Sequence, residues 1–151
     1  MQECQHHIFQ VLTKRSNRLR KLQGELPWPN NIWMGVTVES ERYKHRIDDL
    51  RATDAYIKWL SCEPLLSPLA NLNLEDIAWI VVGGESGPGA RPMREEWALD
   101  IKDQCRKAGT AFFFKQWGGV NKKKTGRRLQ GRLYEEMPDC PQFQSGQVSL
   151  F

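Results

Sequence analysis

The chain contains five short apolar runs, and a cluster of polar residues follows each one. The runs begin near residues 8, 32, 56, 77 and 111. Within them the apolar residues are almost continuous rather than alternating, which is typical of strands that are covered on both faces. The pattern predicts five short, buried β-strands.

The segments between these strands carry helical signals. Ser16 and Gly24 bracket the first segment as a start and a stop, and Ser40 precedes the second, where it can cap a helix. Residues 94–108 carry an apolar stripe at helical spacing and end at Gly109. Strands that alternate with helices form βα units, so the sequence predicts a parallel sheet.

The predicted fold class is α/β, with a parallel-stranded, partial (half) TIM-like β/α barrel of about five strands, because that many strands cannot close an eight-stranded barrel. Residues 63–76 hold two prolines and predict at most one turn of helix. A basic loop and a small hairpin around Gly131 follow the last strand. We expect one domain over residues 1–138 and a flexible tail over residues 139–151.

The amino-acid composition indicates a general class of protein but not its function. An apolar fraction of 40% and six tryptophans indicate a globular chain, and no stretch approaches the roughly 18 apolar residues of a membrane span. No leader-like segment opens the chain, so we expect a soluble, cytoplasmic protein. The net charge of +4 is compatible with a polyanionic partner but does not require one.

The four cysteines, Cys4, Cys62, Cys105 and Cys140, lie far apart in the chain. Their spacing excludes a zinc knuckle, a CxxC redox pair and a local iron–sulfur ligand run, and no metal site is predicted. Cys105 lies on the apolar face of a predicted helix and is expected to be buried. Cys62 follows a strand and is either a core thiol or a pocket residue.

Polar side chains at the strand ends form the predicted site. Because the carboxyl ends of parallel strands share one edge of the sheet, we expect these side chains to surround one pocket. The predicted pocket residues are Lys14, Thr37, Glu39, Glu63, Gly83, Gly84, Glu85, Ser86, Arg91, Lys115, Gln116 and Trp117.

Two of these clusters admit more than one interpretation. Gly83 and Gly84 let a backbone approach a ligand closely, with Glu85 and Arg91 beside it, or they belong to a tight turn that needs positive φ. Three carboxylates at strand ends, Glu39, Glu63 and Glu85, could bind an ammonium group or a hard cation. The alternative is a structural network in which they pair with Lys14, Arg15, Arg91 and Lys115.

The end of the last strand and the loop after it also carry candidate groups. Lys115, Gln116 and Trp117 combine a cation, an amide and an aromatic ring, which suits a flat heteroaromatic ligand, but the tryptophan could instead cap the core. The basic segment that follows could contact phosphates or form an ordinary solvated loop. Its candidate anion-binding residues are Lys122, Lys123, Lys124, Arg127 and Arg128.

Several multi-residue motifs occur in the order found in one family. They are FQVLTKR (9–15), NIWMGVTVES (31–40), SCEPLL (61–66), IVVGGESGPGARPM (80–93), QCRKAG (104–109), FFFKQWGG (112–119) and GRLYEEMP (131–138). Over roughly residues 8–138 the chain resembles a phage-associated family of unknown function, often called the three-Cys-motif or phage-protein family, whose fold is similar to that of radical S-adenosylmethionine enzymes. The resemblance implies a TIM-like β/α barrel with a pocket at the strand carboxyl ends. It also implies a [4Fe–4S] cluster with S-adenosylmethionine.

One feature of that family has no counterpart in this sequence. Family members carry a cysteine cluster in an N-terminal segment, and the resemblance covers their C-terminal part only. Reductive cleavage of a sulfonium needs a cluster held by three closely spaced thiolates, which the four cysteines here do not supply. We therefore expect no cofactor for this chain alone, and S-adenosylmethionine with a [4Fe–4S] cluster only when an N-terminal segment completes it.

Three functions follow from these observations. The favoured one is a phage-borne binding module that engages a host protein or nucleic acid, for example as an inhibitor, or that self-associates through exposed sheet edges. The second is the C-terminal half of a radical S-adenosylmethionine-type enzyme that needs a missing N-terminal segment or a partner chain and is inactive alone. The third is a nucleotide-binding enzyme that uses Glu39, Glu63 and Glu85 with a divalent cation.

Overall fold

The structure, a computed structural model, describes residues 1, 3, 4, 6–121 and 125–139. It contains one five-stranded sheet, and every pair of neighbouring strands runs parallel. The strands and α-helices are, in chain order, β1 (Phe9–Thr13), α1 (Ser16–Leu22), β2 (Ile32–Thr37), α2 (His45–Arg51), β3 (Ile57–Cys62), β4 (Trp79–Gly83), α3 (Glu95–Ala108) and β5 (Ala111–Gln116). The predicted α/β class and the parallel direction of the strands are confirmed.

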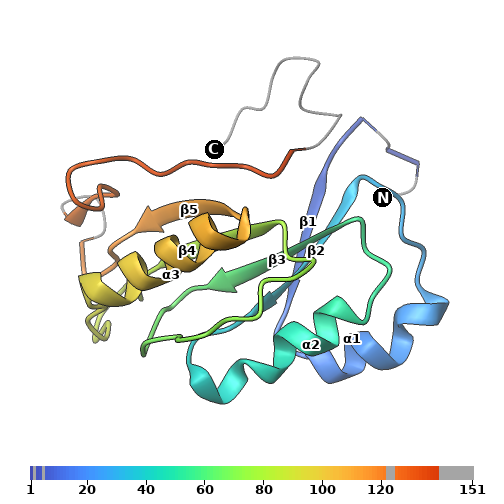
Figure 1. Cartoon of the computed structure of the whole chain (residues 1–151), viewed down its shortest axis with the longest axis horizontal. Coiled ribbons are helices and arrows are strands. Elements are labelled where there is room, and N and C mark those ends of the chain that lie inside the picture. Colours follow the sequence, from blue (N-terminus) through green and yellow to red (C-terminus); the bar gives the residue numbers. More distant parts are fainter. Residues whose placement is uncertain (2, 5, 122–124, 140–151) are drawn as a thin grey trace.

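The order of the strands in the sheet is β1-β2-β3-β4-β5, which is also their order in the chain. Each right-handed crossover therefore moves the chain one place in the same direction and keeps its helix on the same face. The three described helices lie on that one face (Figure 1). Leu19 from α1, Leu50 from α2 and Ile101 from α3 join one core cluster. Strand residues such as Val36 and Ile80 complete that cluster.

The other side of the sheet, which carries Trp33, Trp59, Trp79 and Phe113, is called the aromatic face below. Side chains alternate along a strand, so these rings point away from the helices. The ring centroids of Trp59 and Trp79 are 5.5 Å apart, and Trp33 meets Trp79 edge-on at 6.1 Å. Gly35 leaves room for this layer, because a Cβ atom there would lie 2.4 Å from Cε2 of Trp59.

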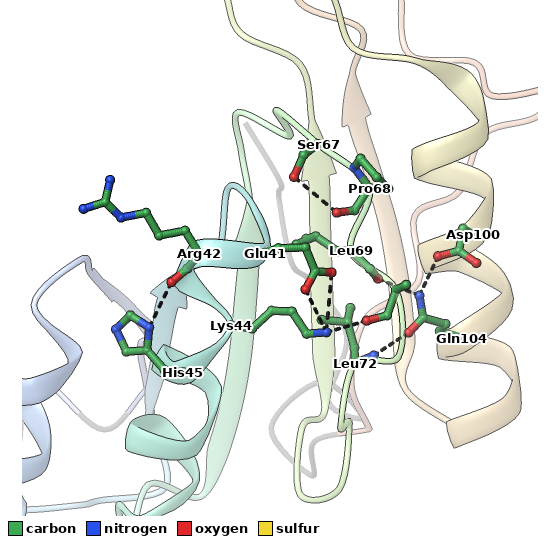
Figure 2. Close-up of polar contacts among 11 residues, drawn as sticks. Glu41, Arg42, Lys44, His45, Ser67, Pro68, Leu69, Leu72, Asp100 and Gln104 are labelled. Carbon is green, nitrogen blue, oxygen red and sulfur yellow. Dashed lines mark hydrogen bonds and ion pairs between the residues drawn. The ribbon is translucent and has the colours of Figure 1, made fainter.

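The connection between β3 and β4, residues 63–76, holds no helix, as predicted. Its buried leucines are Leu65, Leu69, Leu72 and Leu74. Two side chains outside this connection hold it in place through hydrogen bonds to its backbone (Figure 2). Gln104 on α3 donates to the carbonyl of Leu69 at 2.8 Å and accepts from the amide of Leu72 at 2.7 Å. Lys44, just before α2, donates to the carbonyl of Ala70 at 2.5 Å. The connection therefore covers the sheet in place of a crossover helix.

Two predicted helix starts differ from the structure. Ser16 is the first residue of α1 rather than its cap, and its hydroxyl donates to Asp49 on α2 at 2.7 Å. Ser40 makes no side-chain cap bond, because a short 3-10 turn, Glu41–Tyr43, comes before α2. The end of α3 is as predicted: Gly109 has a φ of +72°, in the left-handed region that glycine adopts freely.

The two edges of the sheet differ. The predicted hairpin around Gly131 is present, since Leu129 and Arg132 exchange both backbone hydrogen bonds. The chain then returns along the outer edge of β5, where the amide of Phe114 donates to the carbonyl of Tyr134 at 2.9 Å (Figure 1). At the opposite edge, no described segment pairs with the outer side of β1. Only the β5 edge is therefore covered by the described chain.

Two sequence predictions concern residues outside the described ranges. These are most of the predicted tail, residues 140–151, and the basic residues Lys122, Lys123 and Lys124. Within the described ranges, none of the helices combines the length and apolar character needed to cross a membrane.

Candidate functional site

The carboxyl ends of the five strands lie at one edge of the sheet, because all five run parallel. This edge, with Lys14, Glu39, Glu63, Glu85 and Lys115, is called the strand-end rim below. The pairing of β2 with β3 continues past their ends, where the amide of residue 38 donates to the carbonyl of residue 61 at 2.9 Å. The register therefore brings Glu39 to the position beside Glu63.

Glu39 accepts hydrogen bonds from two cations. Lys14 Nζ lies 2.5 Å from its Oε1, and Arg46 Nη1 lies 3.0 Å from its Oε2. Arg46 also donates to the carbonyl of Thr37 at 2.7 Å, and its guanidinium carbon lies 4.0 Å from the centre of the Tyr43 ring. Glu39 and Arg46 are buried, whereas the Lys14 side chain is 59% exposed. Lys14 is thus the group of this cluster that a ligand can reach.

A second ion pair joins β3 to β5 across β4. Lys115 Nζ lies 3.0 Å from Oε2 of Glu63, and Gln116 Nε2 lies 3.4 Å from its Oε1. Gln116 also donates to the hydroxyl of Ser86 at 2.7 Å. Gly83 ends β4 between the charged residues, and a Cβ atom there would lie 3.0 Å from Oε1 of Glu63. The space that the sequence assigned to a ligand near Gly83 is filled by this carboxylate.

The loops after β4 and β5 are joined by their backbones. The amide of Gly84 donates to the carbonyl of Gln116 at 3.0 Å, and the amide of Gly119 donates to the carbonyl of Glu85 at 2.6 Å. A Cβ atom at Gly84 would lie 1.9 Å from the carbonyl oxygen of Trp117, so only glycine allows this approach. The close backbone approach predicted at Gly84 is therefore made to the neighbouring loop.

Glu85 is held by Arg91 within its own loop. Nε and Nη2 of Arg91 donate to the two carboxylate oxygens at 2.8 Å each, and the Arg91 amide donates to Oε2 at 2.9 Å. These side-chain and backbone hydrogen bonds lower the pKa of Glu85 from its ordinary value of 4.5 to about 2. Gly87 and Gly89 in the same loop have φ values of +109° and +74°. The charged groups of this loop are bonded to each other, which agrees with the alternative prediction that Gly83 and Gly84 belong to a tight turn.

Each of the three predicted carboxylates thus has its own cationic partner. Lys14, Lys115 and Arg91 pair with Glu39, Glu63 and Glu85 respectively. This arrangement matches the structural network that the sequence offered as an alternative. Within the described part of the chain, no group of three His, Cys, Asp or Glu side chains could hold a metal ion. The carboxylates therefore do not converge on one cation.

Trp117 packs against the core. Its ring meets Phe114 edge-on at 5.0 Å, and its indole N–H donates to the carbonyl of Arg128 at 2.8 Å. A ring that is edge-on to the core and bonded through its nitrogen matches the alternative of a capping tryptophan.

The two described members of the predicted anion-binding set are engaged within the protein. Arg127 forms an ion pair with Glu135, and Arg128 donates to the carbonyl of Gly131 at 3.0 Å. The other three, Lys122, Lys123 and Lys124, lie outside the described residues. The phosphate-contacting role of this segment stays a prediction.

Two largely buried residues that carry hydroxyl groups lie side by side next to the rim. Thr37 and Ser61 are partners in the β2–β3 register, on the aromatic-face side of the sheet, and are 2% and 4% exposed. Among the described residues, neither side-chain hydroxyl has a hydrogen-bond partner, and neither oxygen belongs to the fully buried atoms that lack one. The two oxygens therefore keep some accessible surface, where water or a ligand can bond to them. Together with Lys14, this pair forms a polar surface that can bind a small charged or hydroxylated molecule.

The described cysteines do not form a cluster site. Cys62 and Cys105 are buried in the core cluster on the helix side, and Cys4 is half-buried. Burial raises the pKa of the Cys62 thiol far above its ordinary value, and that of Cys105 to about 12. Cys62 is therefore a core thiol. A [4Fe–4S] cluster needs three closely placed thiolates, and no such group occurs among the described residues.

Sequence analysis missed two polar residues beside the rim: Arg46, which pairs with Glu39, and Ser61. Ser61 lies two positions after Trp59, so the alternation of a strand could have placed it on the same face as Thr37. Arg46 precedes an apolar residue of α2, and a buried arginine needs a partner such as a carboxylate. Nothing in its spacing, however, indicates that the partner is Glu39.

Comparison with known proteins gives the family. Over residues 1–138 the chain matches the model of a family described as "Protein of unknown function (DUF5131)", and it belongs to that family. No curated protein and no solved structure is significantly similar to the chain.

Proposed function

We propose that this member of a family of unknown function is a binding module that engages another polypeptide through the outer edge of β1. The observation that carries the proposal is the difference between the two edges of the sheet. Residues 134–136 cover the outer edge of β5, whereas no described segment pairs with the outer edge of β1. An unpaired edge presents a row of backbone donors and acceptors to which another strand can bind.

The exposure of the strand residues also favours the outer edge of β1 as the binding edge. β2, β3 and β4 are buried at every position, while β1 alternates between half-buried and exposed residues. Leu12 of β1, which is in register with Gly35, lies on the aromatic-face side and is 46% exposed. A large apolar side chain beside an unpaired strand is a typical contact for an added strand.

The proposed architecture is a partial β/α barrel. A strand order equal to the chain order, with the helices on one face, is the winding of such barrels, whereas doubly wound sheets reverse the order at a switch point. A strand added to β1 in the parallel direction would continue this winding. The sequence resemblance adds the expectation of a phage-borne module that acts on a host protein. Nucleic acid has less support, because Arg127 and Arg128 are already engaged.

Substitution of Leu12 tests the proposal. The amide of Phe9 faces β2, so by alternation the amide of Leu12 faces outward. Leu12→Pro removes that donor and keeps the pairing with β2, while Leu12→Ala shortens the side chain and keeps the donor. We expect a stoichiometric complex that Leu12→Ala retains and Leu12→Pro loses, with slowed amide exchange at Gln10 and Leu12 in the wild-type complex. A partner that binds Leu12→Pro as well as wild type would refute the proposal.

A second candidate function is favoured by the hydroxyl pair of Thr37 and Ser61. Hydroxyls that are free to bond, on residues that are otherwise buried, suit a small-ligand site, as in the C-terminal part of a radical S-adenosylmethionine-type enzyme that another segment completes. Calorimetry with S-adenosylmethionine, with the chain alone and with its partner, tests this candidate. We expect heat of binding in wild type and its loss in Thr37→Val and Ser61→Ala. No heat in either setting would remove the candidate.

A further inference from the structure

We infer that the β1 edge binds an extended peptide whose side chains are apolar toward the helix layer and whose end beside Arg15 is acidic. The inference rests on the proposed function and adds the chemistry of the partner. Three features occur at this edge: backbone groups and basic side chains that have no partner among the described residues, and an apolar pocket.

The backbone of β1 presents alternate amides to its two sides. The amide of Phe9 donates to the carbonyl of Asn31 at 2.8 Å, so amides at odd positions face β2. The amides of Gln10 and Leu12 therefore face outward, where no described strand pairs with them. In an added strand, side chains opposite Val11 would point to the helix layer, and those opposite Leu12 would point to the aromatic face.

An apolar pocket of about 360 Å³ lies beside β1 on the helix side of the sheet. Val11 of β1, Ile32 and Met34 of β2, and Leu26 and Trp28 from the connection after α1 contribute to its walls. Because Val11 lines the pocket, an apolar side chain opposite Val11 in an added strand would enter it. In strand addition the main chain supplies affinity, and pockets for alternate side chains supply specificity.

Basic side chains follow the carboxyl end of β1 along the chain. Arg15 follows the strand by two residues, and Arg18 and Lys21 lie at successive i+3 positions along α1. All three are exposed, and no ion pair joins them to a described residue. Lys14 beside them is also mostly exposed, although it contacts Glu39. Acidic residues at the corresponding end of a peptide would complement this charge.

The same charges disfavour a second copy of this chain as the occupant. An antiparallel pair of β1 strands centred on Val11 would place Arg15 of one copy opposite His7 of the other. A parallel pair would place two Arg15 residues side by side. Neither arrangement neutralises the basic groups, and like charges in contact oppose association. An acidic peptide from another protein satisfies both the pocket and the charge.

Fluorescence anisotropy with designed peptides tests this chemistry. The probe is a labelled peptide of three Thr-Val repeats followed by three glutamates, with the reverse order as a second probe because an added strand can run either way. The control peptides carry lysine in place of glutamate, or serine in place of valine. The protein variant is Arg15→Glu with Arg18→Glu, and its matched control is Arg106→Glu with Lys107→Glu on α3, which changes the net charge equally.

We expect one of the acidic probes to bind, and to lose about tenfold in affinity when its valines become serines. Arg15→Glu with Arg18→Glu should weaken the acidic probe by about tenfold and favour the lysine peptide, while the control pair should change affinity by less than about twofold. If all peptides bind equally and Leu12→Pro abolishes their binding, the proposed edge function stands and this partner chemistry is wrong. If Leu12→Pro affects the binding of none of them, the proposed function fails as well.

Discussion

A single methyl group added to β2 should disrupt the packing of the aromatic face. In Gly35→Ala, the new Cβ atom would lie 2.4 Å from Cε2 of Trp59, and 2.7 Å from its Cδ2 and Nε1. The indole has little room to move: Trp59 is 6% exposed, its N–H donates to the carbonyl of Trp33 at 3.3 Å, and its ring lies against Trp79. The ring or the backbone of β2 must shift by roughly 1 Å, because carbon atoms in contact are about 3.5–4.0 Å apart.

Two opposing effects set the size of the change. Alanine restricts the unfolded chain more than glycine does, and this alone would stabilise the protein by about 0.4–1 kcal/mol. Overpacking a closed core typically costs about 1–3 kcal/mol and occasionally more. Since several ring atoms overlap the new methyl group at once, we expect Gly35→Ala to lower the free energy of unfolding by about 2 kcal/mol. A domain with a stability of about 5–15 kcal/mol would remain folded, so the change can be measured.

Urea denaturation followed by tryptophan fluorescence measures this difference. Gly24→Ala is the matched control, because Gly24 lies in the 3-10 turn Gln23–Glu25 and no atom lies within 4 Å of an added Cβ. Because only the restriction of the unfolded chain acts there, its free energy of unfolding should rise by up to about 1 kcal/mol rather than fall. In a Trp59→Leu background the cost of Gly35→Ala should largely disappear. A Gly35→Ala protein as stable as wild type, or a cost that persists without the indole, would refute the reasoning.

Three further predictions concern the rim, the β3–β4 connection and the thiols. Arg91 holds the pKa of Glu85 at about 2, below its ordinary 4.5, so their contact is complete above about pH 4.5 and is lost as the pH falls toward 2. An NMR titration should show the Glu85 midpoint returning toward 4.5 in Arg91→Ala, and equal midpoints would contradict the pairing. Gln104→Leu deletes two hydrogen bonds to the connection and should lower the free energy of unfolding by about 1–3 kcal/mol, with faster amide exchange there. Unchanged exchange would exclude this role for Gln104. Iodoacetamide at pH 8 should modify Cys62 and Cys105 only after urea unfolds the chain, because burial raises the pKa of both thiols. Peptide mapping by mass spectrometry checks this, and modification of the native protein would show that the thiols are accessible.

The strands and their direction could be predicted because they depend on local signals. A run such as residues 77–83 is apolar on both faces and is followed by polar residues and a helix, a pattern that suits a buried parallel strand. Once the strands are parallel, Glu39 and Glu63 must lie at the same edge of the sheet. The caps predicted at Ser16 and Ser40 failed because a hydroxyl can bond to another helix, and a turn can come before the helix, without any change in the local pattern.

The contacts of the rim were decided by the tertiary structure. That Glu63 fills the space beside Gly83, and that Arg46 reaches Glu39, depends on the register and on the reach of side chains between separate elements. Likewise, only the folded chain shows that residues 134–136 cover β5 while no described segment pairs with the outer edge of β1. The sequence by itself determined that β2, β3 and β4 are buried, because burial follows from the apolar character of each residue and its neighbours, but the prediction of a buried strand was wrong for β1, which lies at an edge of the sheet. It could not determine which polar groups meet, because hydrogen bonds and ion pairs act over a few ångströms between residues that lie far apart along the chain.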